Sequence, residues 1–208
     1  MLLATDPETA SALVADGTHE ELSHWAAQSI PARVACFDVA LRRLPKPQHL
    51  LALGIDCPLY YSVHSAWAKL APEGSALIHT MRFLRPGERA EPEATKQELE
   101  ALLDVLQPGW REEVMEHSFL PQMVASNAIV QARQGGLRGR PGPAVSGIHN
   151  LYVAGDWVGA EGQLAEACFA SASHAASMIM KVLAAQQGDS TRGNWGLRTV
   201  GTGSWKNE

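Results

Sequence analysis

An acidic residue and several glycines in the last third of the chain have the spacing of a ligand-binding turn. Residues 151–154 form a short apolar run that predicts a buried strand, and Gly155 and Asp156 follow it directly. Open α/β sheets bind ligands at the carboxyl ends of their strands, and glycine allows close approach. An ionised carboxylate only accepts hydrogen bonds, so Asp156 suits the hydroxyl groups of a ribose or ribityl chain. We expect Asp156 to serve a ligand rather than the core.

A helix of small residues is predicted to begin shortly after this turn. Gly159 and Gly162 bring the backbone to its start, and alanine and serine dominate the residues that follow, up to Ser177. The first turn of a helix has N–H groups without intrahelical partners and the positive end of the helix dipole. We therefore expect the bound group to be electron-rich or anionic.

The elements that must position these residues can be predicted along the chain. Residues 1–5 resemble the end of a buried strand, and Asp6-Pro7 or Thr5 can cap a following helix. Between residues 31 and 45 apolar and polar residues alternate, which predicts a strand. Residues 59–64 and 76–83 predict two further strands, separated by the turn residues 72–74. The expected arrangement is an antiparallel sheet.

One helix is predicted firmly between the sheet and the glycine turn. Thr95 and Glu98 have the capping-box spacing, and leucines recur on one face until Pro108. Residues 111–131 show no clear period. The glycines and prolines of residues 134–149 predict a loop in which Arg138 and Arg140 are solvated. Residues 186–208 are polar and glycine-rich, and we expect them to be a disordered tail.

Composition excludes several classes of protein. The 208 residues have a net charge of -5 and no basic stripe, which argues against nucleic acid as a partner. Three cysteines without a CxxC pair predict a reducing, cytoplasmic setting without disulfides or structural zinc. No histidine pair has metal-ligand spacing, so His64 and His79 are expected to be strand residues and no metal is expected. No run of about 20 apolar residues predicts a transmembrane segment.

Residues 150–177 resemble the carboxyl-terminal FAD motif of the flavin amine oxidase superfamily, nearest to its phytoene (carotenoid) desaturase-like branch. The loop GGLRGRPG at 135–142, the segment 63–79 and LLATDP at 2–7 also resemble parts of that branch. The resemblance implies an α/β (α+β) fold, with part of a Rossmann-like FAD domain and an antiparallel-sheet substrate domain with helices. It divides the chain into 1–30 and 150–185 for the FAD domain, 31–133 for the substrate domain, and the loop 134–149.

The resemblance also implies a cofactor, a reaction and site residues. Gly155 and Asp156 would hold the ribityl or pyrophosphate region of FAD, and the backbone of Gly162, Gln163 and Leu164 would face the flavin pyrimidine edge. A small apolar or amine substrate on the sheet of residues 33–84 would give a hydride to the flavin. No catalytic side chain is assigned, and Trp157 would either stack near the flavin or pack in the interior.

The chain departs from this family in one respect. The GxGxxG turn that takes the FAD pyrophosphate is not found in these 208 residues, which leaves three alternatives: a truncated gene product, a fragment, or a subunit of a split enzyme with an amino-terminal partner half. The chain is then part of an FAD-dependent oxidoreductase. The alternative is a non-catalytic remnant, an assembly or binding module that keeps the substrate-domain fold.

Overall fold

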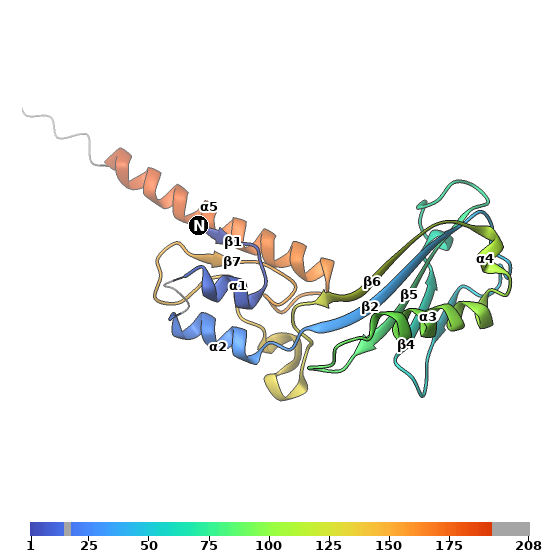
Figure 1. Ribbon diagram of the computed structural model, residues 1–208. Coiled ribbons are helices and arrows are strands. Elements are labelled where there is room, and N and C mark those ends of the chain that lie inside the picture. Colours follow the sequence, from blue (N-terminus) through green and yellow to red (C-terminus); the bar gives the residue numbers. More distant parts are fainter. Residues whose placement is uncertain (15–17, 193–208) are drawn as a thin grey trace, which may run out of the picture.

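The computed structural model describes residues 1–14 and 18–192, which form two sheets and their covering helices (Figure 1). The helices are α1 (Pro7–Ala12), α2 (Glu20–Gln28), α3 (Pro92–Leu106), α4 (Trp110–Glu113) and α5 (Ala165–Arg192). The strands are β1 (Leu2–Leu3), β2 (Ala32–Leu41), β3 (Leu51–Leu53), β4 (Leu59–Val63), β5 (Ala76–Leu84), β6 (Val114–Ser126) and β7 (Tyr152–Val153).

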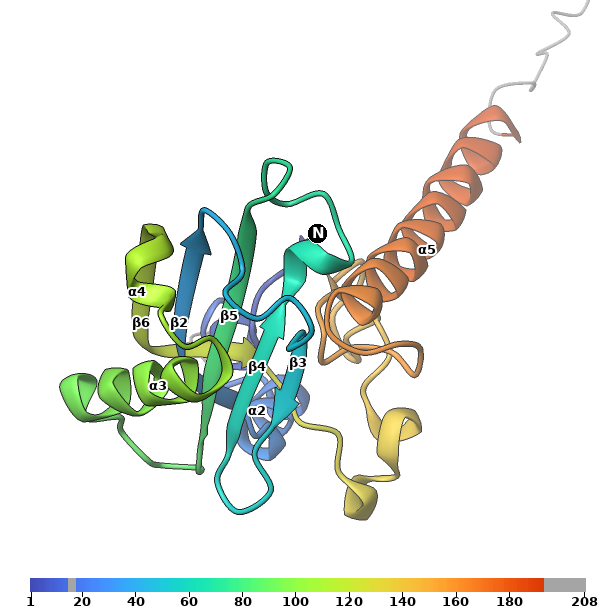
Figure 2. The ribbon, with the colours of Figure 1, turned by 90° about the vertical axis from the view of Figure 1, so that its right-hand side faces the viewer.

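The two sheets have different topologies. Strands β1 and β7 pair in parallel, although nearly the whole chain separates them in sequence. The larger sheet has the order β3-β4-β5-β2-β6, and all its pairs are antiparallel (Figure 2). The α/β (α+β) class, with a parallel and an antiparallel sheet, is therefore confirmed.

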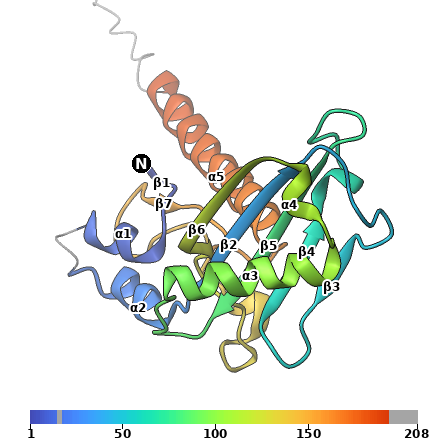
Figure 3. The same cartoon turned by 45° about the vertical axis from the view of Figure 1, so that its right-hand side comes forward.

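The core of the larger sheet lies between its strands and α3. Phe37, Val39 and Leu41 of β2 are fully buried, together with Leu99 and Leu103 of α3. Figure 3 shows α3 lying across this face of the sheet. Because side chains alternate along a strand, the residues of β2 between these point to the opposite face. The alternation in the sequence therefore assigned both faces of β2 correctly.

A second core lies beneath the two-stranded sheet. Leu3 of β1 and Val153 of β7 pack with Leu22 of α2 and with the indole of Trp157, all of them buried. On its other side β7 donates a backbone hydrogen bond, from the Val153 N–H to the Pro143 carbonyl at 2.8 Å. The predicted loop of residues 134–149 thus runs beside β7, with only short 3-10 turns at Ala132–Gln134 and Gly136–Gly139.

The helix α3 begins four residues earlier than the capping box predicts, with its N-cap at Glu91 rather than Thr95. Pro92 is its first residue, and Glu91 stands at the N-cap without a side-chain hydrogen bond. Thr95 is buried within the helix, and Glu98 pairs with Arg82 of β5 at 3.0 Å. The capping-box prediction is wrong because proline already has the backbone angle of a first helical turn, and a tertiary ion pair takes the acidic side chain.

Two strands gave no periodic signal in the sequence. Strand β6 lies at the edge of the larger sheet, where both of its faces are largely exposed. An edge strand needs no apolar alternation, and it tolerates Pro121 because one side of its backbone is unpaired. Strand β3 has three residues at the opposite edge. Alternation reports burial on one face, so it fails for such strands.

The last helix is longer than expected. It continues to Arg192, so residues 186–192 are helical rather than disordered, while residues 193–208 of the predicted tail lie outside the described part of the chain. By length and composition alone, Ala165–Gln186 could cross a membrane, with a mean hydropathy of 1.3. The sequence shows no unbroken apolar run there because Glu166, His174 and Lys181 lie within it. Core helices of soluble proteins meet the same criterion.

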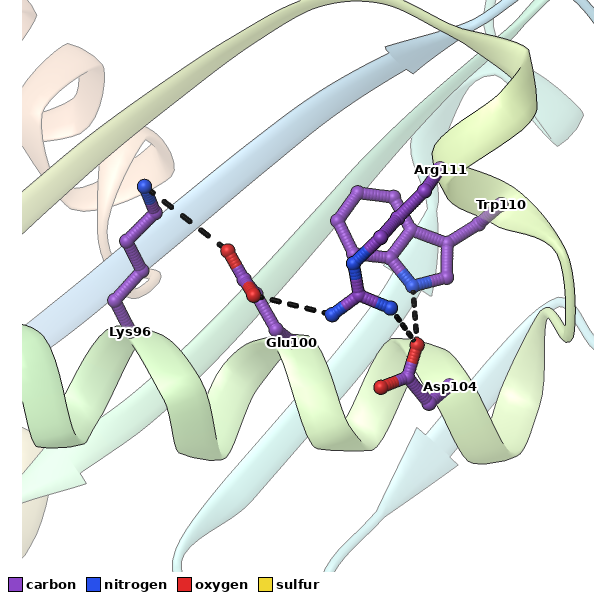
Figure 4. Close-up of polar contacts among 5 residues, drawn as sticks. All are labelled: Lys96, Glu100, Asp104, Trp110 and Arg111. Atoms are coloured by element: carbon purple, nitrogen blue, oxygen red, sulfur yellow. Dashed lines mark hydrogen bonds and ion pairs between the residues drawn. The ribbon is translucent and has the colours of Figure 1, made fainter.

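A charged network fixes α4 against α3 (Figure 4). Arg111 bonds to Asp104 and, at 3.1 Å, to Glu100, and its guanidinium lies over the Trp110 ring at 4.6 Å. The Trp110 indole N–H donates to the same Asp104 carboxylate at 2.9 Å. The hydrogen bond from Arg111 lowers the pKa of Asp104. Each of these charges has a partner within the protein, so the network stabilises the sheet domain and offers no binding site.

The N-cap of α1 gives a first testable prediction. Asp6 accepts hydrogen bonds from the Thr9 N–H (2.8 Å) and hydroxyl (2.6 Å), which lower its pKa. We expect Asp6→Ala to lower the free energy of unfolding by about 1 kcal/mol. A depressed pKa stabilises the fold above the unfolded value of about 4 and loses this effect as the pH falls through the folded value. The difference in stability between the parent and Asp6→Ala should therefore be present at neutral pH and shrink at acidic pH, as measured by thermal unfolding. A difference that stays constant with pH contradicts the assignment.

Candidate functional site

The two parallel strands end side by side, and a hollow lies at their carboxyl ends. Residues 4–6 follow β1, and residues 154–156 follow β7. Together with Asn127 and the α5 residues Cys168, Phe169 and Ala172, they line an open hollow of about 500 Å³. The turn predicted from the sequence is thus at the edge of a parallel sheet where ligands bind.

Asp156 accepts three hydrogen bonds from within the protein. Its carboxylate accepts from the Ser126 hydroxyl at 2.8 Å and from the Asn127 backbone N–H and side-chain amide at 2.8 and 2.9 Å. The residue is 6% exposed. Ser126 is the last residue of β6, so this carboxylate joins the parallel sheet to the antiparallel one. The expectation that Asp156 has no role in the core is therefore wrong, because a chain segment without sequence signal folds onto it.

Position 155 must be glycine because a neighbouring side chain occupies the space that a Cβ would take. A Cβ built there would lie 2.8 Å from the Trp157 indole nitrogen, which donates to the Thr5 carbonyl at 2.8 Å. Trp157 is buried and contacts the ring of Trp25, with centroids 6.0 Å apart. Of the two alternatives for Trp157, the structure has the interior one. The indole ties the ends of β1 and β7 together, and glycine is the residue that leaves room for it.

The start of α5 presents backbone donors. Gly162 has φ +67 and Leu164 has φ +51, so the chain turns through left-handed conformations before the helix begins. In the described part of the chain, the N–H groups of Gly162, Gln163 and Leu164 donate no hydrogen bond. Gln163 and Leu164 are also exposed. These donors and the helix dipole together favour an electron-rich or anionic group, as the sequence predicts.

Two side chains fix the backbone of the turns at Gly162 and Gly155. The sequence did not identify either of them as structural. Arg140 donates to the Gly162 carbonyl at 2.9 Å, so it is not the solvated arginine expected of a mobile loop. The Ser171 hydroxyl accepts from the Gly155 N–H at 3.1 Å and joins α5 to that turn. Ser171 lies on the buried stripe of α5 with Ala167 and Ala175. Small residues at this spacing allow the helix to lie close to the sheet.

The titratable groups at the hollow are not poised as nucleophiles. Burial, and then the charge of Asp156, raise the pKa of the Cys168 thiol. A thiol of raised pKa is protonated at neutral pH and is a poor nucleophile. The Asp6 carboxylate is occupied by its cap contacts. The hollow is therefore suited to holding a group rather than to attacking one, and the donors of residues 162–164 lie one turn before the α5 residues that line it.

Sequence comparisons do not place the chain in a family. No protein-family model matches it, and no curated protein matches it.

Solved structures do share its fold. An oxidoreductase from Methanosarcina mazei superposes with a TM-score of 0.56 at 18% identity, covering 86% of this chain and 42% of that protein. Reduced UDP-galactopyranose mutase superposes with a TM-score of 0.59 at 9% identity, covering 86% of this chain and 41% of that one. The chain thus spans less than half the length of these proteins. Likeness at such identities establishes the fold alone.

Proposed function

We propose that this chain forms part of an FAD-dependent oxidoreductase that takes a hydride from a C–H or C–N bond of its substrate. The observation that carries the proposal is the place of the unpaired N–H groups of residues 162–164. They stand at the start of α5, whose next turn lines the hollow at the ends of β1 and β7. The two proteins of similar fold are an oxidoreductase and a mutase in a reduced state, which supports a fold that carries a redox group.

The donor set fits the electron-rich edge of a flavin. When bound, FAD would supply the hydride acceptor. The N–H groups of Gly162, Gln163 and Leu164 would hold its pyrimidine edge, where fixed dipoles stabilise negative charge without reorganisation. Arg140 keeps the Gly162 peptide in place. Gly155 and Asp156 are proposed to adjoin the ribityl or pyrophosphate region; Asp156 acts there chiefly by fixing Ser126 and Asn127 beside the hollow.

The proposed assembly includes a second half with a GxGxxG turn. Among the described residues β1 pairs only with β7, so its outer edge has no partner strand. The α5 face beyond the buried stripe carries exposed apolar side chains. Parallel sheets are normally covered on both faces. We therefore propose that the second half adds a strand beside β1 and a helix against the exposed face of α5. The substrate, small and apolar or an amine, would lie against the antiparallel sheet.

Two matched glycine variants test the flavin contact. A Cβ at Gly162 would lie 2.6 Å from the Glu166 Cγ and 3.0 Å from the Ala167 nitrogen, so Gly162→Ala must displace the turn. A Cβ at Gly159 meets nothing within 4 Å, although its φ is also positive, at +83. Gly159→Ala therefore reproduces the backbone strain without the collision. We expect Gly162→Ala to weaken FAD binding by at least about tenfold more than Gly159→Ala does.

FAD binding is measured by flavin fluorescence and by the yellow chromophore retained on gel filtration. The chain is tested alone and with the product of a neighbouring gene that encodes GxGxxG. Equal affinity of the two variants contradicts the assigned contact. If no flavin is retained under either condition, the oxidoreductase proposal fails, and complex formation without flavin would identify an assembly module instead.

A further inference from the structure

A cluster of three potential metal ligands lies on the larger sheet, on the face opposite α3. Asp38 of β2 and His79 of β5 stand directly opposite each other in the antiparallel pair, and Cys36 lies two residues before Asp38 on the same face. The Cys36 sulfur, an Asp38 oxygen and a His79 ring nitrogen all lie within 4.8 Å of one another. Cys36 is buried, and the Asp38 and His79 side chains are 30% and 23% exposed.

The three donor groups converge on a single point. His79 Nδ1 lies 2.7 Å from Asp38 Oδ1, and the Cys36 Sγ donates to the same oxygen at 3.0 Å. The ring of His64 lies against that of His79, with centroids 3.9 Å apart. The Cys36 thiol and the His79 ring thus both contact the same Asp38 oxygen.

We propose that Cys36, Asp38 and His79 bind a divalent cation of the Zn²⁺ class. Sulfur, nitrogen and carboxylate oxygen are the three donors that proteins offer to zinc, and three protein ligands with an open fourth position are typical of a reactive site. A thiolate, a carboxylate and a neutral imidazole carry two negative charges together, which a dication neutralises. The fourth position is left to water on the exposed side.

The present geometry is close to what such a site requires. Around a tetrahedral ion with bonds of about 2.0–2.3 Å, the ligand atoms stand about 3.3–3.7 Å apart. The two hydrogen-bonded separations of 2.7 and 3.0 Å therefore need to open by less than about 1 Å, which side-chain rotation supplies. The backbone positions are fixed by the β2–β5 pairing. Binding releases the Cys36 thiol proton to solvent, and the proton between His79 Nδ1 and the Asp38 carboxylate also leaves Nδ1, with Nε2 protonated, so that the Nδ1 lone pair faces the ion.

The sequence gives no hint of this cluster because its members do not share a motif. Cys36 and His79 are 43 positions apart, and only the pairing of β2 with β5 brings them together. The cluster lies on a different sheet from the hollow beside β7, and its binding of a cation does not depend on the flavin proposal. A failure of one proposal therefore leaves the other standing.

Cobalt(II) is the probe, because a thiolate ligand gives it a near-ultraviolet charge-transfer band. We expect the full chain, first treated with a chelator, to bind one Co²⁺ with this band and with the visible bands of tetrahedral cobalt, and Zn²⁺ to displace it. Cys36→Ser should abolish the charge-transfer band. Cys57→Ser and Cys168→Ser, which alter the two exposed cysteines, are the matched controls and should retain it.

Two further variants keep the test decisive if Cys36→Ser does not fold. His79→Gln and Asp38→Asn alter partly exposed side chains, and each should weaken Zn²⁺ binding at least about 100-fold in calorimetric titrations. Circular dichroism and thermal unfolding verify the fold of each variant. The proposal is overturned if the parent chain shows no charge-transfer band at millimolar Co²⁺, if the band survives in folded Cys36→Ser, or if His79→Gln binds Zn²⁺ as the parent does.

Discussion

Replacing Asp156 by alanine is expected to lower the free energy of unfolding by about 3 kcal/mol or more. The substitution removes the acceptor of two N–H groups of Asn127 and the nearer of two acceptors of the Ser126 hydroxyl, whose contact with the Ala128 carbonyl is 3.4 Å long; all three are partly buried. A hydrogen bond to a charged group contributes about 1.5–3 kcal/mol, and an unsatisfied buried donor adds a desolvation penalty. Denaturant unfolding followed by circular dichroism measures the change.

Two matched variants, Ser126→Ala and Asp156→Asn, separate the effect of the negative charge of Asp156 from the effect of its shape. Ser126→Ala removes one of the three donors and is expected to cost about 1 kcal/mol. Asp156→Asn keeps the shape but places an NH₂ group against donors, so its effect should lie between those of Ser126→Ala and Asp156→Ala. Unchanged stability of Asp156→Ala would contradict the role of Asp156 as the joint between the two sheets.

That joint has a consequence for the proposed reaction. Ser126 ends β6 of the sheet on which the substrate is proposed to lie, and Asp156 follows the strand beside the proposed flavin position. The carboxylate therefore fixes the distance between the two surfaces. Catalysis by proximity is sensitive to displacements of about 1 Å, so a change at Asp156 is expected to reduce turnover in the assembled enzyme even at temperatures where the variant remains folded.

The isolated 208-residue chain is expected to self-associate and to bind hydrophobic dye strongly. Figure 1 shows that α5 packs on the small sheet only along its first half and then projects beyond it. Its exposed side chains include Phe169, Met180 and Leu183, Leu164 just before it is also exposed, and Leu2 lies on β1, which has one unpaired edge among the described residues. Soluble monomers rarely expose apolar patches larger than a few hundred Å². Size-exclusion chromatography with light scattering gives the oligomeric state.

A double substitution on the surface of α5 tests whether this helix causes the self-association and the dye binding. Phe169→Ser with Met180→Ser removes apolar area from side chains that are 74% and 65% exposed, so it should leave the fold unchanged and reduce dye binding and association. Val105→Ser is the control, because Val105 is also 74% exposed but lies on α3. If the parent chain is monodisperse, unfolds cooperatively and does not bind the dye, the exposed face of α5 is stable without a partner, and the prediction is wrong.

The sequence by itself determined the elements whose signals are local. The alternation at Phe37, Val39 and Leu41 predicted β2 and its buried face, because a strand covered on one face repeats every two residues. Asp6 and Pro7 predicted the start of α1, because N-caps depend on neighbouring residues alone. The apolar run at 151–154, the glycine turn and the small residues likewise predicted a buried strand followed by a helix, which are β7 and α5.

Only the tertiary structure decided what the site residues contact. Asp156 meets Ser126 and Asn127 because an edge strand without periodic signal ends beside it. Position 155 is glycine because the indole of Trp157 occupies the space of a Cβ, and no sequence spacing predicts this contact. Cys36 and His79 meet through strand pairing across 43 positions. Local patterns record each residue's own backbone and burial, whereas hydrogen-bond partners depend on which distant segments the fold places side by side.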